Sequence, residues 1–259
     1  MDLKLDGRVI FVTGGSRGIG KSIVEGLLEE GACVGTCARN LPELEKLQDS
    51  LPEPMRSRLI IHACDVRNSE AVHIAVNLTI EQFGRLDGIV TNAGFGISGR
   101  VLETPVNDWM SQYELKLMSV LNVVHAALPA LRQSDAGRVV IMNSVTANIP
   151  DRRMAAVSAS RTAVSQVANM LADDLAPDGI CVNVINIGAI ETNRQIDRFE
   201  RSGSALLYSD WAKKEAEHRG ILLGRFGQTD EVSPIVMLLL SPLSSYITGS
   251  SIDVAGGVT

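Results

Sequence analysis

A glycine-rich segment near the N-terminus has the residue types and the spacing that bind a dinucleotide. The segment follows an apolar run that ends at Thr13, and it contains Gly14, Gly15, Ser16, Arg17, Gly18, Ile19 and Gly20. Gly14 permits a tight turn, while Gly18 and Gly20 let the backbone and a ligand approach closely as a helix begins. Free N–H groups and a partial positive charge at that helix N-terminus suit a pyrophosphate. The spacing, Gly-x-x-x-Gly-x-Gly, differs from the Gly-x-Gly-x-x-Gly of most dinucleotide dehydrogenases.

Two arginines bear on which dinucleotide binds. A carboxylate at the end of the second predicted strand would hydrogen-bond an adenosine ribose and repel a 2′-phosphate. This chain has Ala38 and then Arg39 at that place. Together with Arg17 in the glycine-rich segment, Arg39 can clamp a 2′-phosphate between two guanidinium groups. The sequence therefore predicts NADP(H) in preference to NAD(H), the alternative being two solvated surface arginines.

Polar and small residues also follow the later strands of the chain. Asp65 ends the third predicted strand and can accept a hydrogen bond from an adenine amino group. Asn92, Ala93 and Gly94 end the fourth. Because the carboxyl ends of parallel strands meet at one edge of a sheet, these residues are expected beside the glycine-rich segment.

In combination, these motifs resemble the short-chain dehydrogenase/reductase family, and within it the 3-oxoacyl-carrier-protein reductase-like branch. The resemblance covers nearly the whole chain and rests on Thr13–Gly20, Asp65-Val66, Asn92-Ala93-Gly94, the Gly188-x-x-x-Thr192 run, Tyr246–Gly249 and Gly256-Gly257. It implies a doubly wound sheet of strand order 3-2-1-4-5-6-7 and, usually, a homotetramer. Besides the glycine-rich segment and Arg39, it implies cofactor contacts at Asp65, Val66, Asn92, Ala93, Gly94, Arg161, Gly188, Ile190 and Thr192.

The resemblance also implies four catalytic positions, of which this chain keeps one. In the family, a Ser polarises the carbonyl, a Tyr transfers the proton, a Lys lowers the pKa of that Tyr, and an Asn holds a relay water. Here the Ser is Ser144, but the other positions are Val157, Arg161 and Lys116. Valine has no proton to give and a guanidinium stays protonated. Since general acid catalysis contributes about 10²–10⁴-fold, ordinary carbonyl reduction is expected to be largely silenced.

Lys116, Tyr113, Ser144 and the substrate itself are the candidates for a substitute in proton transfer. Lys116 and Arg161 fall near one cleft, where their charges repel unless a bound carboxylate or enolate lies between them. Lys116 can act as an acid if its pKa is depressed, or it can fill space and extend its ammonium to solvent. Tyr113, one helical turn earlier, has a phenol, although packing is the commoner role of a lone helix tyrosine.

These residues need an alternating α/β framework to bring them together, and the chain provides one. Apolar strand candidates are 9–13, 33–37, 59–63, 88–91, 138–142, 181–187 and 251–254. Helical candidates are 19–30, 42–51, 69–83, 105–131, 154–175 and 230–240. This alternation predicts a single α/β domain with a doubly wound (Rossmann) seven-stranded parallel sheet flanked by helices.

A charged stretch with interspersed aromatic residues, about 193–220, interrupts the alternation. It contains Tyr208 and Trp211 among Lys, Arg and Glu, which indicates amphipathic helices. Its position leaves two interpretations open, a surface helix pair or a lid over the substrate cleft.

Composition excludes several other classes of function. The formal charge of 24 − 30 = −6 disfavours nucleic-acid binding. No run of 18 apolar residues indicates a membrane span, and the first residues lack the apolar core of a signal peptide, so a cytoplasmic protein is expected. The four cysteines have neither disulfide nor metal spacing and are expected to be buried free thiols.

The sequence thus predicts an NADP(H)-binding oxidoreductase with an atypical active site and a small-molecule substrate. A non-redox isomerase or lyase that uses the cationic pocket remains open, as does a silent subunit or sensor that pairs with a paralogue. A homo-oligomer is also expected, because the apolar run 235–240 and the strand 250–254 would otherwise leave an exposed patch and edge.

Overall fold

Seven parallel strands form the central sheet in the computed structural model, which describes residues 2–258. The strands are β1 Val9–Thr13, β2 Cys33–Ala38, β3 Leu59–Ala63, β4 Gly88–Thr91, β5 Arg138–Ser144, β6 Cys181–Ile187 and β7 Ser251–Val254. Their order is β3-β2-β1-β4-β5-β6-β7, and every neighbouring pair is parallel. The predicted doubly wound sheet and its strand order are confirmed, with β2 and β5 ending slightly later than predicted.

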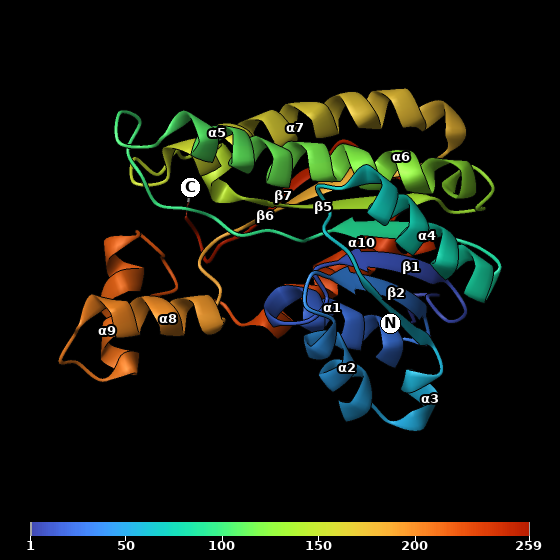
Figure 1. Ribbon diagram of the computed structural model, residues 1–259, viewed down its shortest axis with the longest axis horizontal. Helices are drawn as coiled ribbons and strands as arrows, with labels where there is room; N and C mark the ends of the chain where they lie inside the picture. Colours follow the sequence, from blue (N-terminus) through green and yellow to red (C-terminus); the bar gives the residue numbers. More distant parts are fainter. Residues whose placement is uncertain (1, 259) are drawn as a thin grey trace.

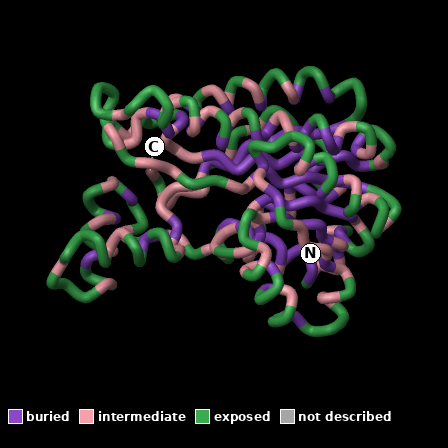
Figure 2. Tube along the Cα trace, in the orientation of Figure 1, coloured by how far each residue is buried: buried purple, intermediate pink, exposed green. Residues whose placement is uncertain are grey.

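The strands are apolar along their length because helices cover both faces of the sheet. All of β1 and the first six residues of β6 are buried. A parallel sheet covered on both sides requires this continuous rather than alternating apolar pattern. Buried residues accordingly concentrate along the strands at the centre of the molecule (Figure 2).

Helices form a layer on each side of the sheet (Figure 1). They are α1 Gly18–Glu29, α2 Leu41–Ser50, α3 Glu53–Arg56, α4 Ser69–Phe83, α5 Val106–Tyr113, α6 Ser119–Leu131, α7 Ala155–Leu175, α8 Asn193–Ser202, α9 Tyr208–His218 and α10 Ser233–Leu240. One layer contains α4, α6 and α7, and the opposite layer contains α1, α2 and α10. The short helix α3 was not predicted. The charged stretch after β6 forms α8 and α9, so its predicted helical character is confirmed.

A π-helical segment, Glu114–Met118, joins α5 to α6. The continuous run Val106–Leu131 is long and apolar enough to cross a membrane by length and composition alone. In the fold this run packs against α4 and α7, so its apolar residues serve the core. Single π-helical turns within α-helices occur often at functional sites, and this one contains Lys116.

The apolar run 235–240 does not form the exposed patch that the sequence predicted. It lies in α10, which packs against α1, with Val236 and Leu239 fully buried in the shared core. That part of the argument for an oligomer is wrong, because the run covers the sheet rather than the surface. The argument from an exposed strand edge is unaffected, since β7 lies at the end of the sheet, and the oligomer remains a prediction.

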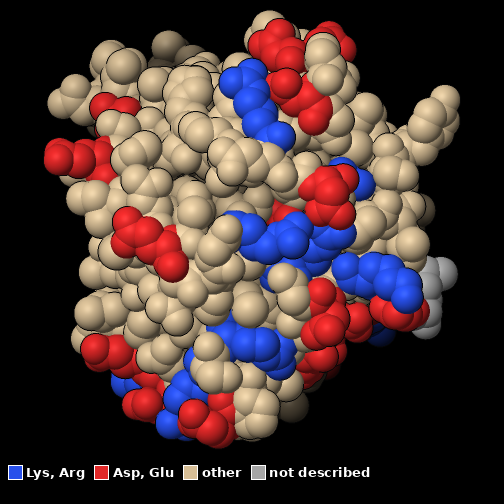
Figure 3. Space-filling model, turned by 90° about the vertical axis from the view of Figure 1, so that its right-hand side faces the viewer, with Lys and Arg blue, Asp and Glu red and all other residues tan. Residues whose placement is uncertain are grey.

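Asp87 organises a polar cluster at the amino ends of the strands. Its carboxylate accepts hydrogen bonds from the backbone N–H of Val9 at 2.9 Å, from Ser134 Oγ at 2.6 Å and from Arg85 Nη2 at 2.6 Å. The carboxylate is 3% exposed, whereas Asp135 in the same cluster is 68% exposed. On this side of the molecule, basic side chains lie beside acidic ones (Figure 3).

Replacing Asp87 by alanine is expected to lower the free energy of unfolding by about 3 kcal/mol, because three donors lose their buried acceptor. Urea unfolding measures the change. Asp135→Ala is the matched control, and its effect should stay below about 1 kcal/mol because that carboxylate is solvated. Equal effects of the two substitutions would contradict the assignment of Asp87 as the centre of the cluster.

Candidate active site

The glycine-rich segment after β1 forms a cradle without room for side chains. Gly14 and Gly18 have φ of +74° and +56°, a conformation that disfavours other residues. A Cβ on Gly15 would collide with Thr36 Oγ1, and one on Gly20 would collide with the Gly14 carbonyl oxygen. These positions therefore require glycine for the turn and for close packing within the fold, and contact of this segment with a pyrophosphate remains a prediction.

Asn92 holds this cradle in place from the end of β4. Its Nδ2 donates hydrogen bonds to the carbonyl oxygens of Thr13 at 3.0 Å and Gly14 at 3.2 Å. The backbone N–H groups of Asn92 and Ala93 each donate to Thr13 Oγ1 at 3.0 Å. The structure thus brings the ends of β1 and β4 together, with the Asn92 side chain turned toward the loop.

The residues predicted to contact the adenosine part of the cofactor follow β1, β2 and β3. Arg17 and Arg39 are both exposed, and the Arg39 guanidinium lies 5.5 Å from the centre of the Phe95 ring. Asp65 accepts hydrogen bonds from Arg67 Nε at 3.0 and 3.1 Å. Hydrogen bonding from Arg67 holds the pKa of Asp65 below its usual value. Asp65 is therefore engaged by Arg67 in this structure, and the predicted adenine contact remains a prediction.

The remaining predicted cofactor residues lie after β3 and between β6 and α8. Val66 is buried, and its carbonyl oxygen accepts a hydrogen bond from Asn122 Nδ2 at 3.0 Å. Gly188 packs so closely on Ala255 that a Cβ would lie 2.8 Å from the Ala255 Cα. Ile190 is buried, and Thr192 precedes α8 with its methyl group facing Gly18.

Arg161 is turned toward the end of β5. Its Nη1 donates to the Met142 carbonyl oxygen at 2.7 Å and to Asn143 Oδ1 at 3.4 Å, while its buried Nε has no partner in residues 2–258. Burial, with a smaller effect from Arg194, lowers the pKa of Arg161 to about 10. The guanidinium remains charged at neutral pH, as expected, but its Nη1 is already engaged by the backbone. The expected contact between Arg161 and a ribose remains a prediction.

Ser144 follows Asn143 on β5, and Val157 lies one helical turn before Arg161 on α7. Ser144 ends β5, and its Oγ accepts hydrogen bonds from the Thr146 backbone N–H at 3.3 Å and from Thr146 Oγ1 at 3.1 Å. Val157 is buried in the first turn of α7. The Nδ2 of the neighbouring Asn143 donates to Ser165 Oγ at 2.9 Å.

Lys116 is buried at the carboxyl edge of the sheet, with 4% of its surface exposed. Its Nζ lies directly over Gly94, so closely that a Cβ on this glycine would collide with it. Burial and then the charges of Arg161 and Arg194 hold the pKa of Lys116 well below its usual value, and within residues 2–258 no carboxylate offsets them. The alternative in which Lys116 extends its ammonium to solvent is therefore wrong. Tyr113, the other helix candidate, is half-buried at the end of α5.

Arg194, which the sequence analysis missed, adds a third cation to this site. Its Nη2 and the Val157 Cγ2 lie 3.2 and 3.3 Å from the position that a Cβ on Gly96 would occupy. Arg194 is an exposed residue, but partial burial of its guanidinium, with repulsion from Arg198, lowers its pKa. The only sequence signal is its place, directly after the Gly188-x-x-x-Thr192 run.

The helices α8 and α9 have a small core of their own (Figure 1, orange). Phe199, Tyr208 and Trp211 pack together with ring centroids 5.5 to 5.9 Å apart. Arg198 stacks on Trp211 and donates to Glu215 Oε2 at 2.7 Å. This core orients the first turn of α8, which contains Arg194. Whether the two helices close over a ligand remains a prediction.

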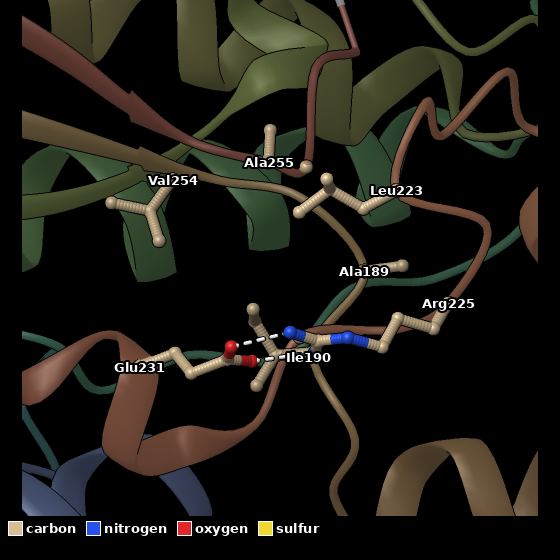
Figure 4. Close-up of a pocket in the computed structure, with 9 residues that line it drawn as sticks. Ala189, Ile190, Leu223, Arg225, Glu231, Val254 and Ala255 are labelled. Atoms are coloured by element: carbon tan, nitrogen blue, oxygen red, sulfur yellow. Dashed lines mark hydrogen bonds and ion pairs between the residues drawn. The ribbon is translucent and has the colours of Figure 1, made fainter.

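A small hollow of about 100 Å³ lies beside the ends of β6 and β7 (Figure 4). Arg225 and Glu231 form two hydrogen bonds of 2.6 and 2.7 Å across it. Ile190 is the one predicted site residue in its lining, and none of the candidate proton donors reaches it. The candidate active site therefore comprises Lys116, Ser144, Arg161 and Arg194, near the residues that follow β4, β5 and β6 and outside this hollow.

The chain is similar to known reductases over nearly its full length. A family model described as enoyl-(acyl carrier protein) reductase matches residues 14–259. A chloroplastic tropinone reductase homologue of Arabidopsis thaliana is 34% identical over 260 residues, which cover 98% of this chain and 76% of that protein.

Two solved structures show the same fold. The NADPH-bound short chain oxidoreductase of Pseudomonas aeruginosa PAO1, described as containing an atypical catalytic center, is 36% identical with a TM-score of 0.92, and the match covers 97% of this chain and 96% of that one. The L-sorbose reductase of Gluconobacter frateurii, complexed with NADPH and L-sorbose, is 28% identical with a TM-score of 0.95, covering 100% and 98% of the two chains.

Proposed function

The chain belongs to the short-chain dehydrogenase/reductase family, and we propose that it is an NADP(H)-dependent oxidoreductase in which Lys116 replaces the family's tyrosine as proton donor. The observation that carries this proposal is the position of Lys116. Its ammonium is buried over Gly94 at the carboxyl edge of the sheet, and burial holds its pKa well below the usual value.

The residues present fit NADP(H). The glycine cradle leaves no space for side chains between the ends of β1, β2 and β4, which suits close approach of a pyrophosphate to the N-terminus of α1. Arg17 and Arg39 offer guanidinium groups to a 2′-phosphate, and Ala38 places no carboxylate against it. When bound, NADPH supplies a hydride to an electrophilic carbon. The NADPH-bound relatives support this assignment.

Lys116 supplies the proton that a hydride acceptor requires. As the acceptor oxygen gains an electron pair, the Lys116 ammonium donates a proton to it and becomes a neutral amine, which regains a proton from solvent between turnovers. A lowered pKa favours this transfer, because the proton leaves a weaker base. Arg161 and Arg194 stabilise the developing negative charge, and Ser144 Oγ is available as a further donor.

Arg39 is expected to determine the preference for NADPH. Arg39→Ala should weaken NADPH binding by about 10-fold or more and leave NADH binding nearly unchanged, because only NADPH has the 2′-phosphate. Fluorescence titration with both nucleotides measures this. Lys46→Ala, which removes an exposed charge from α2, is the control. An unchanged ratio of the two affinities in Arg39→Ala would overturn the assignment.

Transfer of a labelled hydride tests the function itself. The protein is incubated with NADPH carrying deuterium at C4 of the nicotinamide and with a panel of ketones, enones and imines. We expect deuterium on the reduced carbon of at least one acceptor. NADPH binding without transfer to any acceptor would overturn the redox proposal in favour of a non-redox enzyme or a silent cofactor-binding subunit.

A further inference from the structure

Three cationic side chains from different elements converge on the proposed cleft. Lys116 comes from the π-helical segment, Arg161 from α7 and Arg194 from the first turn of α8. They are close enough that Arg161 and Arg194 both disfavour the charged form of Lys116. Bringing like charges together away from water is unfavourable, so the arrangement needs a compensating negative charge.

The described part of the chain, residues 2–258, provides no such compensation. The charged neighbours that affect Lys116 and Arg161 are all cations, and Arg161 Nε has no hydrogen-bond partner. On the helical insertion, the acid Glu215 is paired with Arg198 at 2.7 Å and with Arg219 at 3.5 Å.

The site differs in this respect from the amino ends of the strands, in a protein whose formal charge is −6. At the amino ends of the strands, arginines are paired with acids, as in Arg85 with Asp87 at 2.6 Å and Arg132 with Asp178 at 2.8 Å. An excess of basic residues therefore does not explain the unpaired cations. Their charge is concentrated in the place where a substrate would bind.

We propose that the substrate is an anion, and that Arg194 is the residue that selects it by binding its carboxylate or an equivalent anionic group. The proposal rests on the proposed function, because it assigns the substrate class of the same site. Arg194 is suited to this role because its guanidinium faces Gly96 and Val157, and it offers paired donors that match a carboxylate. Arg161 and Lys116 lie deeper, against β5 and Gly94, where they face the reacting end.

The cofactor's phosphates are a less suitable partner for the cluster. The glycine cradle follows β1, whereas Lys116 lies over the residues that follow β4, and Arg161 lies against β5. However, Thr192 contacts Gly18, so the start of α8 lies near the cradle. The experiment must therefore separate an effect of Arg194 on the nucleotide from an effect on the substrate.

Binding to the NADP⁺ complex tests the proposal without any turnover. Isothermal titration compares acetoacetate and longer 3-oxo acids with their methyl esters, pairs that differ by one negative charge. In the native protein at least one acid should bind about 10-fold or more tightly than its ester, as for a charged hydrogen-bonded pair. Arg194→Gln should abolish that ratio, and Arg194→Lys should keep part of it. Arg201→Gln, an equal loss of charge from the exposed end of α8, should keep it fully.

Each outcome decides the proposal. Equal binding of acid and ester in every pair, or a preference that survives in Arg194→Gln, overturns it. A loss of NADP⁺ affinity in Arg194→Gln with the acid preference intact assigns Arg194 to the nucleotide and also overturns it. A clear acid preference in a protein that transfers no deuterium would leave the anion site standing while the redox function fails.

Discussion

Replacing Lys116 by methionine is expected to lower kcat for NADPH-dependent reduction by about 10²–10⁴-fold, the usual contribution of a positioned general acid. Methionine fills a similar volume over Gly94 but has no proton to give. The same substitution should raise the free energy of unfolding at neutral pH by about 0.5–2 kcal/mol, as is common when a strained functional group is removed. Loss of activity together with a gain in stability would separate a chemical role from a structural one.

The pH dependence follows from the lowered pKa of Lys116. The acid donates only when protonated, so the reduction rate should be constant at low pH and fall as pH rises through a pKa well below 10.5. For stability, the unfolded chain keeps a proton on this lysine up to 10.5 while the folded protein releases it earlier. The free energy of unfolding should therefore rise with pH between the folded pKa and 10.5. Both dependences should be absent in Lys116→Met.

Lys213→Met, an exposed lysine on α9, is the matched control and should change neither rate nor stability. Stopped-flow measurement of NADPH oxidation and urea unfolding from pH 6 to 10 provide the two readouts. A Lys116→Met variant with native kcat would remove Lys116 from the mechanism. In that case, loss of activity in Tyr113→Phe would identify the phenol as the donor.

The second large effect is expected from the triple variant Val157→Tyr, Arg161→Lys, Lys116→Asn. It should reduce simple activated ketones at least about 10²-fold faster than the native protein, the value of one well-placed acid. The new phenol would lie one helical turn from an ammonium that lowers its pKa, and Ser144 is already present. Removing Lys116 frees the space over Gly94 for the relay water.

Neutral ketones are the right substrates for this comparison, because they do not supply the negative charge that the native cluster of cations requires. Steady-state kinetics with NADPH compare the triple variant with Val157→Tyr alone. In the single variant the phenol would face Arg194 and residue 161 would still be an arginine. A native protein that already reduces such ketones as fast as the triple variant would contradict the prediction and show that its cluster of cations accepts neutral substrates.

The strands, helices and glycine-rich loop of this protein depend on local sequence, and they could therefore be predicted from it. Each strand is a short apolar run between polar turns, and the glycines between Thr13 and Gly20 mark a loop that only small residues can form. The position of Val157 four residues before Arg161 likewise places both on one face of α7. These features depend on neighbours in the chain, so spacing and residue type were sufficient to predict them.

Only the tertiary structure decided what the charged residues do. The sequence could not tell a buried Lys116 from a solvated one, because its burial depends on how the π-helical segment and α7 pack over Gly94. Arg194 is distant in sequence from both partners and reaches them only because α8 follows β6 at the same edge of the sheet. Electrostatic energy depends on distances in space and on exclusion of water, and neither quantity is encoded in the spacing of residues along the chain.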